Sequence, residues 1–178
     1  MLEHKFSATG ADLKVTDGTM ISGYASLFGK TDQGGDSVAP GAYAASLAKG
    51  RSIKMLWQHD PAQPIGVWDE VREDANGLWV KGRLLPDVAK GREAVSLITA
   101  GAIDGLSIGY RTLKAHKSDH GGRILTVLDL WEVSLVTFPM LPDARVGAKS
   151  DAPETAMMRD LAQLFHAARK EVRPKRIG

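Results

Sequence analysis

The stretch that decides the fold is RTLKAHKSDHGGRILTVLDLWEVSLVTF, residues 111–138, in which two long β-favouring runs flank a Gly121-Gly122 turn. Two further hairpins are predicted nearer the N-terminus. The segment KVTDGTMISGYASLF, residues 14–28, turns at Asp17-Gly18, and VWDEVREDANGLWVKGRL, residues 67–84, turns at Asn76-Gly77. Because hairpins join antiparallel strands, these segments predict a mostly antiparallel sheet.

Two helices are expected to interrupt the strands. PGAYAASLAKG, residues 40–50, has a proline near its start and a glycine past its end. VAKGREAVSLITAG, residues 88–101, keeps apolar residues at helical spacing, and Gly101 can cap its C-terminus. We therefore predict an α+β, β-dominated fold, a small and mostly antiparallel β-barrel, closed or partly closed, with flanking helices.

The composition changes after Pro142. DARVGAKSDAPET, residues 143–155, is typical of a linker, and after it apolar residues follow one helical stripe: Met157, Leu161, Leu164, Phe165 and Ala168. We predict a domain at residues 1–145, followed at 146–178 by a linker and a C-terminal amphipathic helix with a basic end. This helix either docks on the body or binds a partner.

The bulk composition excludes several classes of protein. The 178 residues suffice for one core, and no apolar run approaches the roughly 20 residues that span a bilayer, so no membrane association is expected. We expect no secretory signal, and the absence of cysteine excludes disulfides and a thiol nucleophile. The net charge of +2 arises from the basic last ten residues, so no direct nucleic-acid partner is expected.

Ser107 lies in Gly105-Leu-Ser-Ile-Gly109, which fits G-x-S-x-G, the pattern of a serine nucleophile on a sharp turn. In an α/β-hydrolase that serine joins a strand to a following helix. Here a helix is predicted before the serine and a strand after it, so that fold is excluded by context. Ser107 is then either an ordinary strand-edge serine or a nucleophile of another design.

His59 is the candidate general base. In SIKMLWQHDPAQPIG, residues 52–66, strand alternation places Ile53, Met55 and His59 on one side. We expect His59 at the end of its strand, where DPAQPIG begins a loop. A side chain with a pKa near neutrality suits proton transfer at that place, although a core histidine bonded to a carbonyl is the alternative.

Glu132 is expected to be at least half buried, because both faces of TVLDLWEVSLVTFPM, residues 126–140, are largely apolar. A buried carboxylate is costly unless a partner compensates it. That partner is either an arginine, in a structural pair, or a histidine whose tautomer the carboxylate fixes.

Two weaker patterns could suggest a metal site. His116 and His120, with Asp119, have an H-x3-H spacing, and Asp32 and Asp36 lie in KTDQGGDSVAPG, residues 30–41. The first lies in a glycine turn, and the second lacks the glutamate of a calcium loop. We interpret both as polar turns and expect no metal and no cofactor.

Four blocks in order resemble the prohead (capsid maturation) protease family of tailed phages. They are ISGYASLFGKTDQGGDSVAPGAYAASL, IKMLWQHDPAQPIGVW, GAIDGLSIGYR and LWEVSLVTFPMLPDA, at residues 21–47, 53–68, 101–111 and 130–144. The resemblance implies a serine endopeptidase with a fold similar to the herpesvirus assembly protease, a small β-barrel ringed by helices.

The resemblance also implies roles for individual residues. Ser107 matches the family's nucleophile and His59 its histidine. Glu132 is favoured as the third member, with Asp60 as the competing candidate. A substrate or oxyanion loop is expected to use Gly105, Gly109 and Arg145.

The implied substrates and partners are the scaffold protein and the scaffolding segment of the major capsid protein. They would be cut inside the procapsid, in the cytoplasm of a bacterial host, and self-cleavage is expected in the linker at 143–156. By analogy with related viral proteases, the chain is also expected to form a homodimer. The alternative function is a catalytically inactive β-barrel component of capsid assembly or of the scaffold, and an esterase is disfavoured by the context of Ser107.

Overall fold

The three predicted hairpins are present in the structure, a computed structural model that describes residues 3–6, 14–16, 18–119 and 121–138. Antiparallel pairing joins β2 (Lys14–Thr16) to β3 (Met20–Leu27), and β6 (Asp60–Glu73) to β7 (Gly77–Leu84). The third and longest hairpin joins β8 (Gly105–Lys117) to β9 (Arg123–Val136). The glycine turns therefore located the sheet's local pairings correctly.

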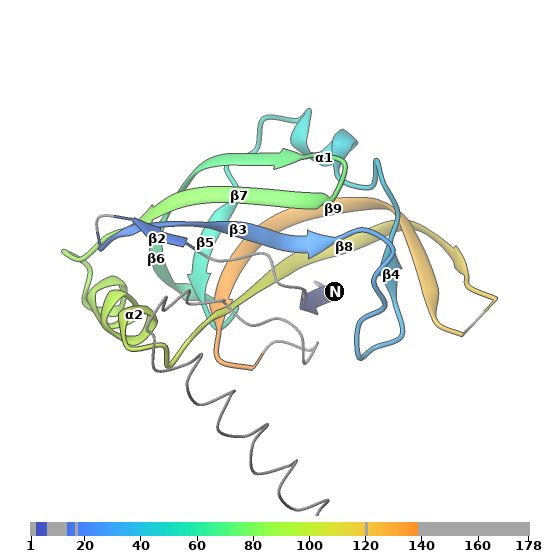
Figure 1. Ribbon diagram of the computed structural model, residues 1–178. Coiled ribbons are helices and arrows are strands. Elements are labelled where there is room, and N and C mark those ends of the chain that lie inside the picture. The colour runs from blue at the N-terminus through green and yellow to red at the C-terminus, as the bar shows by residue number, and fades with distance from the viewer. Residues whose placement is uncertain (1–2, 7–13, 17, 120, 139–178) are drawn as a thin grey trace, which may run out of the picture. The chain divides into compact units, whose positions relative to one another are not determined.

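The remaining strands complete one sheet. They are β1 (Glu3–Phe6), β4 (Ser37–Val38) and β5 (Lys54–Trp57). The order is β1-β8-β9-β5-β6-β7-β3-β2, and β4 pairs with β9 off this path. Among the described residues the pairings form an open path, and the sheet curls into a half-barrel that brings β3 against β8 (Figure 1). The β-dominated α+β prediction is confirmed, with an open curled sheet in place of a closed barrel.

Strand β9 is the centre of the sheet near the site. Along one edge it pairs with β8, and along the other it pairs in parallel with β4 and then with β5. Between these two partners, the β9 backbone bonds to the segment around the first helix: Leu128 N–H donates to the Ala42 carbonyl, and Leu130 N–H donates to Ser46 Oγ. This edge of β9 is thus bonded to neighbouring segments at both ends and between them.

The two helices are α1 (Ala44–Leu47) and α2 (Ala89–Thr99). The prediction for α2 is confirmed, and Gly101 after it has a φ of +70°. Helix α1 is shorter than the predicted 40–50. Gly41 has a φ of +85°, which a helix does not allow, and the Glu73 carboxylate accepts hydrogen bonds from the N–H groups of Gly41 and Tyr43. The predicted C-terminal helix lies outside the described residues, and the domain boundary at 145 stays a prediction.

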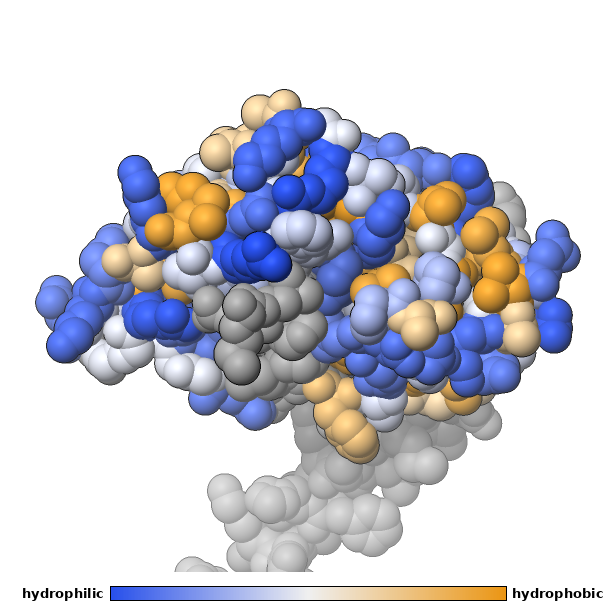
Figure 2. Space-filling model, turned by 180° about the vertical axis from the view of Figure 1, so that it is seen from behind, coloured by the Kyte–Doolittle hydropathy of each residue, from blue (hydrophilic) through white to orange (hydrophobic). Residues whose placement is uncertain are grey.

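One cluster of buried apolar side chains holds the strands and helices together. Its largest fully buried members include Tyr43, Tyr110, Ile21, Met55, Ile65, Leu78, Ile108, Leu125, Leu128 and Leu130. Each fully buried aliphatic side chain stabilises the fold by about 1.5–3 kcal/mol relative to exposure. On the face seen in Figure 2, hydrophobic residues form small groups between hydrophilic ones. Both strands of the β8–β9 hairpin contribute to the core, which fixes the frame of the site described below.

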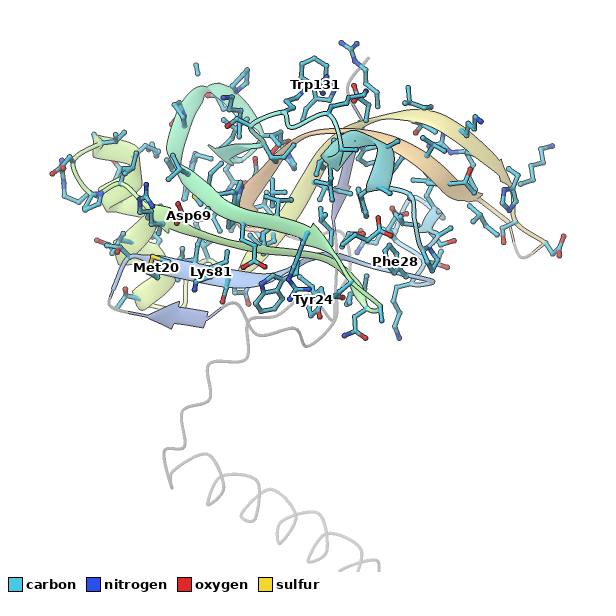
Figure 3. All side chains as sticks on the ribbon, turned by 90° about the horizontal axis from the view of Figure 1, so that it is seen from above. Met20, Tyr24, Phe28, Asp69, Lys81 and Trp131 are labelled. Carbon is cyan, nitrogen blue, oxygen red and sulfur yellow. The ribbon has the colours of Figure 1, made fainter. Side chains whose placement is uncertain are left out.

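Asp129 is a nearly buried carboxylate on β9 with three partners. Lys49 Nζ lies 2.8 Å from Asp129 Oδ1, Arg51 lies 3.3 Å from Oδ2, and the indole N–H of Trp131 donates to Oδ2 at 3.0 Å. The guanidinium of Arg51 also stacks 4.0 Å over the Trp131 ring, which is labelled in Figure 3. The hydrogen bond from Lys49, followed by that from Arg51, lowers the pKa of Asp129, against the opposing effect of burial.

Asp129→Asn is expected to reduce the free energy of unfolding by about 1–2 kcal/mol at pH 7. Because the folded-state pKa is lowered, this stabilisation is complete above the unfolded-state pKa and is lost as the pH falls through the folded-state value. The difference in free energy of unfolding between wild type and Asp129→Asn should therefore be constant from pH 7 to about 5 and should decrease below about pH 4. Urea unfolding at each pH measures it.

Asp69→Asn is the control for Asp129→Asn. Asp69 pairs with Arg83 at 2.6 Å, but the two side chains are 36% and 53% exposed. That pair should contribute no more than about 0.5 kcal/mol. Two results would contradict a stabilising role for the ionised Asp129 carboxylate. One is an equal loss of unfolding free energy in both variants, and the other is a difference between wild type and Asp129→Asn that increases as the pH falls.

Candidate active site

Three segments far apart in sequence meet at strand β9. Glu132 lies on β9 and Ser107 on β8, where Ser107 stands opposite Ser134 in the register. On the other side of β9, β5 ends at Trp57, and His59 follows two residues later. The β-pairing alone therefore places His59, Ser107 and Glu132 next to one another.

The local structure around His59 differs from the predicted one. It does not end a strand: Gln58 and His59 form a two-residue turn with φ of +50° and +62°, and DPAQPIG belongs to β6, where a loop was expected. Positive φ at both positions is the signature of the tight hairpin turn that asparagine and glycine normally occupy. For two residues with side chains this backbone is strained, by the order of 1–2 kcal/mol each.

The strained turn is held by hydrogen bonds to the end of β9. The Gln58 N–H donates to the Leu135 carbonyl at 2.9 Å, which continues the parallel pairing of β5. The Gln58 side-chain amide donates to Thr137 Oγ1 at 2.6 Å. The turn therefore has a defined position relative to Glu132, which precedes Leu135 on β9 by three residues.

The imidazole of His59 bridges a hydroxyl and a carboxylate. Its Nε2 lies 2.6 Å from Ser107 Oγ, and its Nδ1 lies 2.5 Å from Glu132 Oε1. A carboxylate accepts, so Nδ1 carries the proton and Nε2 accepts from the serine hydroxyl. Ser107 is fully buried and Glu132 is 3% exposed, whereas the His59 side chain retains 12% exposure. This hydrogen-bond chain can move a proton from Ser107 to the ring.

Ser134 is a further member of the site that the sequence reasoning missed. Its hydroxyl donates to Glu132 Oε2 at 2.6 Å and accepts the backbone N–H of His59 at 3.2 Å. Strand alternation already placed Ser134 on the same face as Glu132. That was the available signal, but a serine in an apolar strand carries no motif.

Asp60, the competing candidate for the third position, points elsewhere. Its carboxylate accepts the Ala62 N–H at 2.8 Å and the Gln63 side-chain amide at 2.7 Å, and these bonds lower its pKa. The residue next to the His59 ring is therefore Glu132. Arg145, the possible cationic member of an oxyanion site, lies outside the described residues.

The two motif glycines occupy different places. Gly105 starts β8 opposite Val136, and Gly109 stands opposite Glu132. A Cβ on Gly109 would lie 2.0 Å from Glu132 Oε1, so this glycine leaves room for the carboxylate. The expected part of Gly105 and Gly109 in a substrate or oxyanion loop stays a prediction.

The other polar patterns take structural roles. Asp36 binds the guanidinium of Arg123 and accepts its N–H, while the Asp36 N–H donates to Asp32. His116 lies on the exposed end of β8, and His120 lies outside the described residues. Within the described ranges no group of three or more His, Asp or Glu side chains could hold a metal ion. Likewise, no helix of the described part is long and apolar enough to cross a membrane.

The geometry is that of a serine activated by a carboxylate-oriented histidine. A sequence model described as caudovirus prohead serine protease matches residues 7–158. The chain belongs to that family. The match covers all of the site described above and agrees with the resemblance noted from the sequence.

One relative by sequence agrees with the family assignment. The prohead protease of Enterobacteria phage HK97 is 32% identical over 146 residues, which are 80% of this chain. The chain spans 65% of that relative's length. The capsid assembly protease of bacteriophage T4 has 13% identity and a TM-score of 0.63, covering 78% of this chain and 98% of its own, and therefore shares the fold. The varicella-zoster virus protease matches with a TM-score of 0.41 and 13% identity over 80% of this chain and 76% of its own.

Proposed function

We propose that this chain is a serine endopeptidase of capsid maturation, with Ser107 as nucleophile, His59 as general base and Glu132 as the residue that orients His59. The observation that carries the proposal is the imidazole bridge, 2.6 Å to Ser107 Oγ and 2.5 Å to Glu132 Oε1. Strained backbone and a buried carboxylate both cost stability, and a purely structural sheet has no need of either.

The reaction proposed is acyl transfer. Ser107 Oγ attacks the peptide carbonyl while its proton passes to His59 Nε2, and the carbonyl electrons move to the oxygen. His59 returns that proton to the leaving amine as the C–N bond breaks. A water molecule, deprotonated by the same nitrogen, then attacks the acyl carbonyl, and His59 returns the proton to Ser107 Oγ as the ester C–O bond breaks. Glu132 stabilises the imidazolium formed in each step, and backbone N–H groups of a glycine-bearing loop, assisted by Arg145, would stabilise the oxyanion.

The proposed substrates are the scaffold protein and the scaffolding segment of the major capsid protein, cut inside the procapsid in the bacterial host. Family membership supports this choice, as does the relative from phage HK97, which is a prohead protease. We also propose self-cleavage within 143–156. This range spans the boundary between a protease domain at 1–145 and the segment 146–178. That last segment is proposed to carry the enzyme into the shell.

A fluorophosphonate probe tests the nucleophile without requiring the substrate. The wild type is expected to gain the mass of one phosphonyl group, on the peptide containing Ser107, because only an activated serine attacks the probe at neutral pH. Ser107→Ala should gain none. Ser96→Ala, which removes an exposed serine of α2, should label like the wild type.

The same samples test self-cleavage by intact mass over time and N-terminal sequencing of the fragments. Fragments that begin within 143–156 support the proposed site, and cuts elsewhere discard it. A folded wild type that neither labels nor cleaves co-expressed capsid protein would support the alternative, an inactive capsid-assembly component.

A further inference from the structure

Ser134 is fully buried at the point where three strands of the site meet. In the register of β9 it stands opposite Ser107 on β8 and opposite Leu56 on β5. The position therefore touches the nucleophile's strand on one side and the strand leading to His59 on the other. Glu132, two residues earlier, has register partners on the same two strands, Gly109 on β8 and Lys54 on β5.

The Ser134 hydroxyl acts both as a donor and as an acceptor. Its single hydrogen is donated to Glu132 Oε2 at 2.6 Å, and an oxygen lone pair accepts the His59 N–H at 3.2 Å. Donation to Oε2 fixes the rotation of the carboxylate, so that the other oxygen, Oε1, faces the ring. The hydrogen bond from the His59 N–H to Ser134 Oγ fixes the backbone to which the imidazole ring is attached.

The backbone at His59 requires such support because its φ of +62° is unfavourable for a residue with a side chain. The bonds of Gln58 hold the first residue of the turn, and Ser134 holds the second. Loss of the Ser134 hydroxyl would remove this acceptor of the His59 N–H and one of the hydrogen bonds that orient the Glu132 carboxylate. Movement of either group lengthens the contacts on which proton transfer depends.

We propose that Ser134 is a positioning residue that holds the His59 turn and the Glu132 carboxylate at fixed positions relative to each other. It acts through these two groups and does not itself touch the reacting atoms. The inference rests on the proposed function, since it assigns Ser134 a part in the same reaction.

The test measures inactivation by a fluorophosphonate, whose saturation kinetics separate kinact from KI. Ser134→Ala is expected to lower kinact by about 10- to 100-fold, the loss typical of a hydrogen bond to a charged group, with KI changed less than threefold. The matched control is Ser26→Ala, another fully buried strand serine, which should leave kinact within threefold.

Two further readouts separate positioning from general destabilisation. The downfield proton signal of His59 Nδ1–H should shift or broaden in Ser134→Ala and stay unchanged in Ser26→Ala. In a Glu132→Gln background, Ser134→Ala should lower kinact by less than threefold, because one of the two groups that Ser134 positions has already lost its charge. Circular dichroism and thermal unfolding monitor the fold.

The outcomes distinguish the two proposals. A folded wild type that does not label defeats the proposed function, and the inference with it. A wild type that labels, beside a Ser134→Ala variant with kinact within threefold and an unchanged Nδ1–H signal, overturns the inference alone. If Ser134→Ala does not fold, Ser134→Cys decides: its weaker hydrogen bonds should still lower kinact at least fivefold, and an unchanged kinact overturns the inference.

Discussion

Ser107→Ala is expected to lower turnover by on the order of 10⁶, to the limit of detection, while the sheet stays folded. The substitution removes the hydroxyl that lies 2.6 Å from His59 Nε2, so no proton is transferred from it and no acyl-enzyme forms. The backbone of β8 is untouched. The free energy of unfolding should change by only about 1 kcal/mol, the value of one hydrogen bond.

The measurement is the rate of cleavage of co-purified capsid protein by wild type and variant, followed by intact mass. Ser96→Ala accompanies both as a control that alters an exposed helix position. If Ser107→Ala retained more than about 1% of the wild-type rate, another group would be the nucleophile, because triads that lose theirs keep far less. Cleavage unaltered in both variants would indicate a contaminating protease.

The local part of this fold was predictable from the sequence, and the long-range part was not. Glycine turns located three hairpins, and helical spacing located α2 (Ala89–Thr99). The parallel pairing of β5 with β9 joins residues about 80 positions apart and has no local signature. The shortening of α1 has a similar cause, because the carboxylate that bonds Gly41 and Tyr43 belongs to Glu73, 30 or more residues away.

The site divides in the same way. Ser107 was singled out by a motif and Glu132 by its place as a carboxylate in an apolar strand, and the predicted burial of Glu132 is confirmed. The position of His59 was inferred from strand alternation, which fails at a turn with two positive φ angles. Ser134 was missed because its importance comes from two tertiary contacts, and a buried serine in a strand carries no signal of them.

Gly109→Ala is expected to lower turnover by about 10³- to 10⁴-fold, close to the loss of a triad's carboxylate. The added Cβ would lie 2.0, 2.6 and 2.8 Å from Oε1, Cδ and Cγ of Glu132, well inside van der Waals contact. That side chain is held by His59 and Ser134, so it cannot move without releasing Nδ1. Relief of the overlap should also cost about 1–3 kcal/mol of stability.

A double-mutant cycle with Glu132→Ala tests this explanation of Gly109→Ala. All three atoms nearest to the added Cβ belong to the Glu132 side chain beyond its own Cβ, so Glu132→Ala removes the overlap entirely. In that background Gly109→Ala should change urea stability by less than about 0.5 kcal/mol and the inactivation rate by less than threefold. An equal loss in both backgrounds would locate the defect in the β8 backbone. Full activity of Gly109→Ala alone would contradict the prediction that the Glu132 carboxylate must keep its present position for proton transfer.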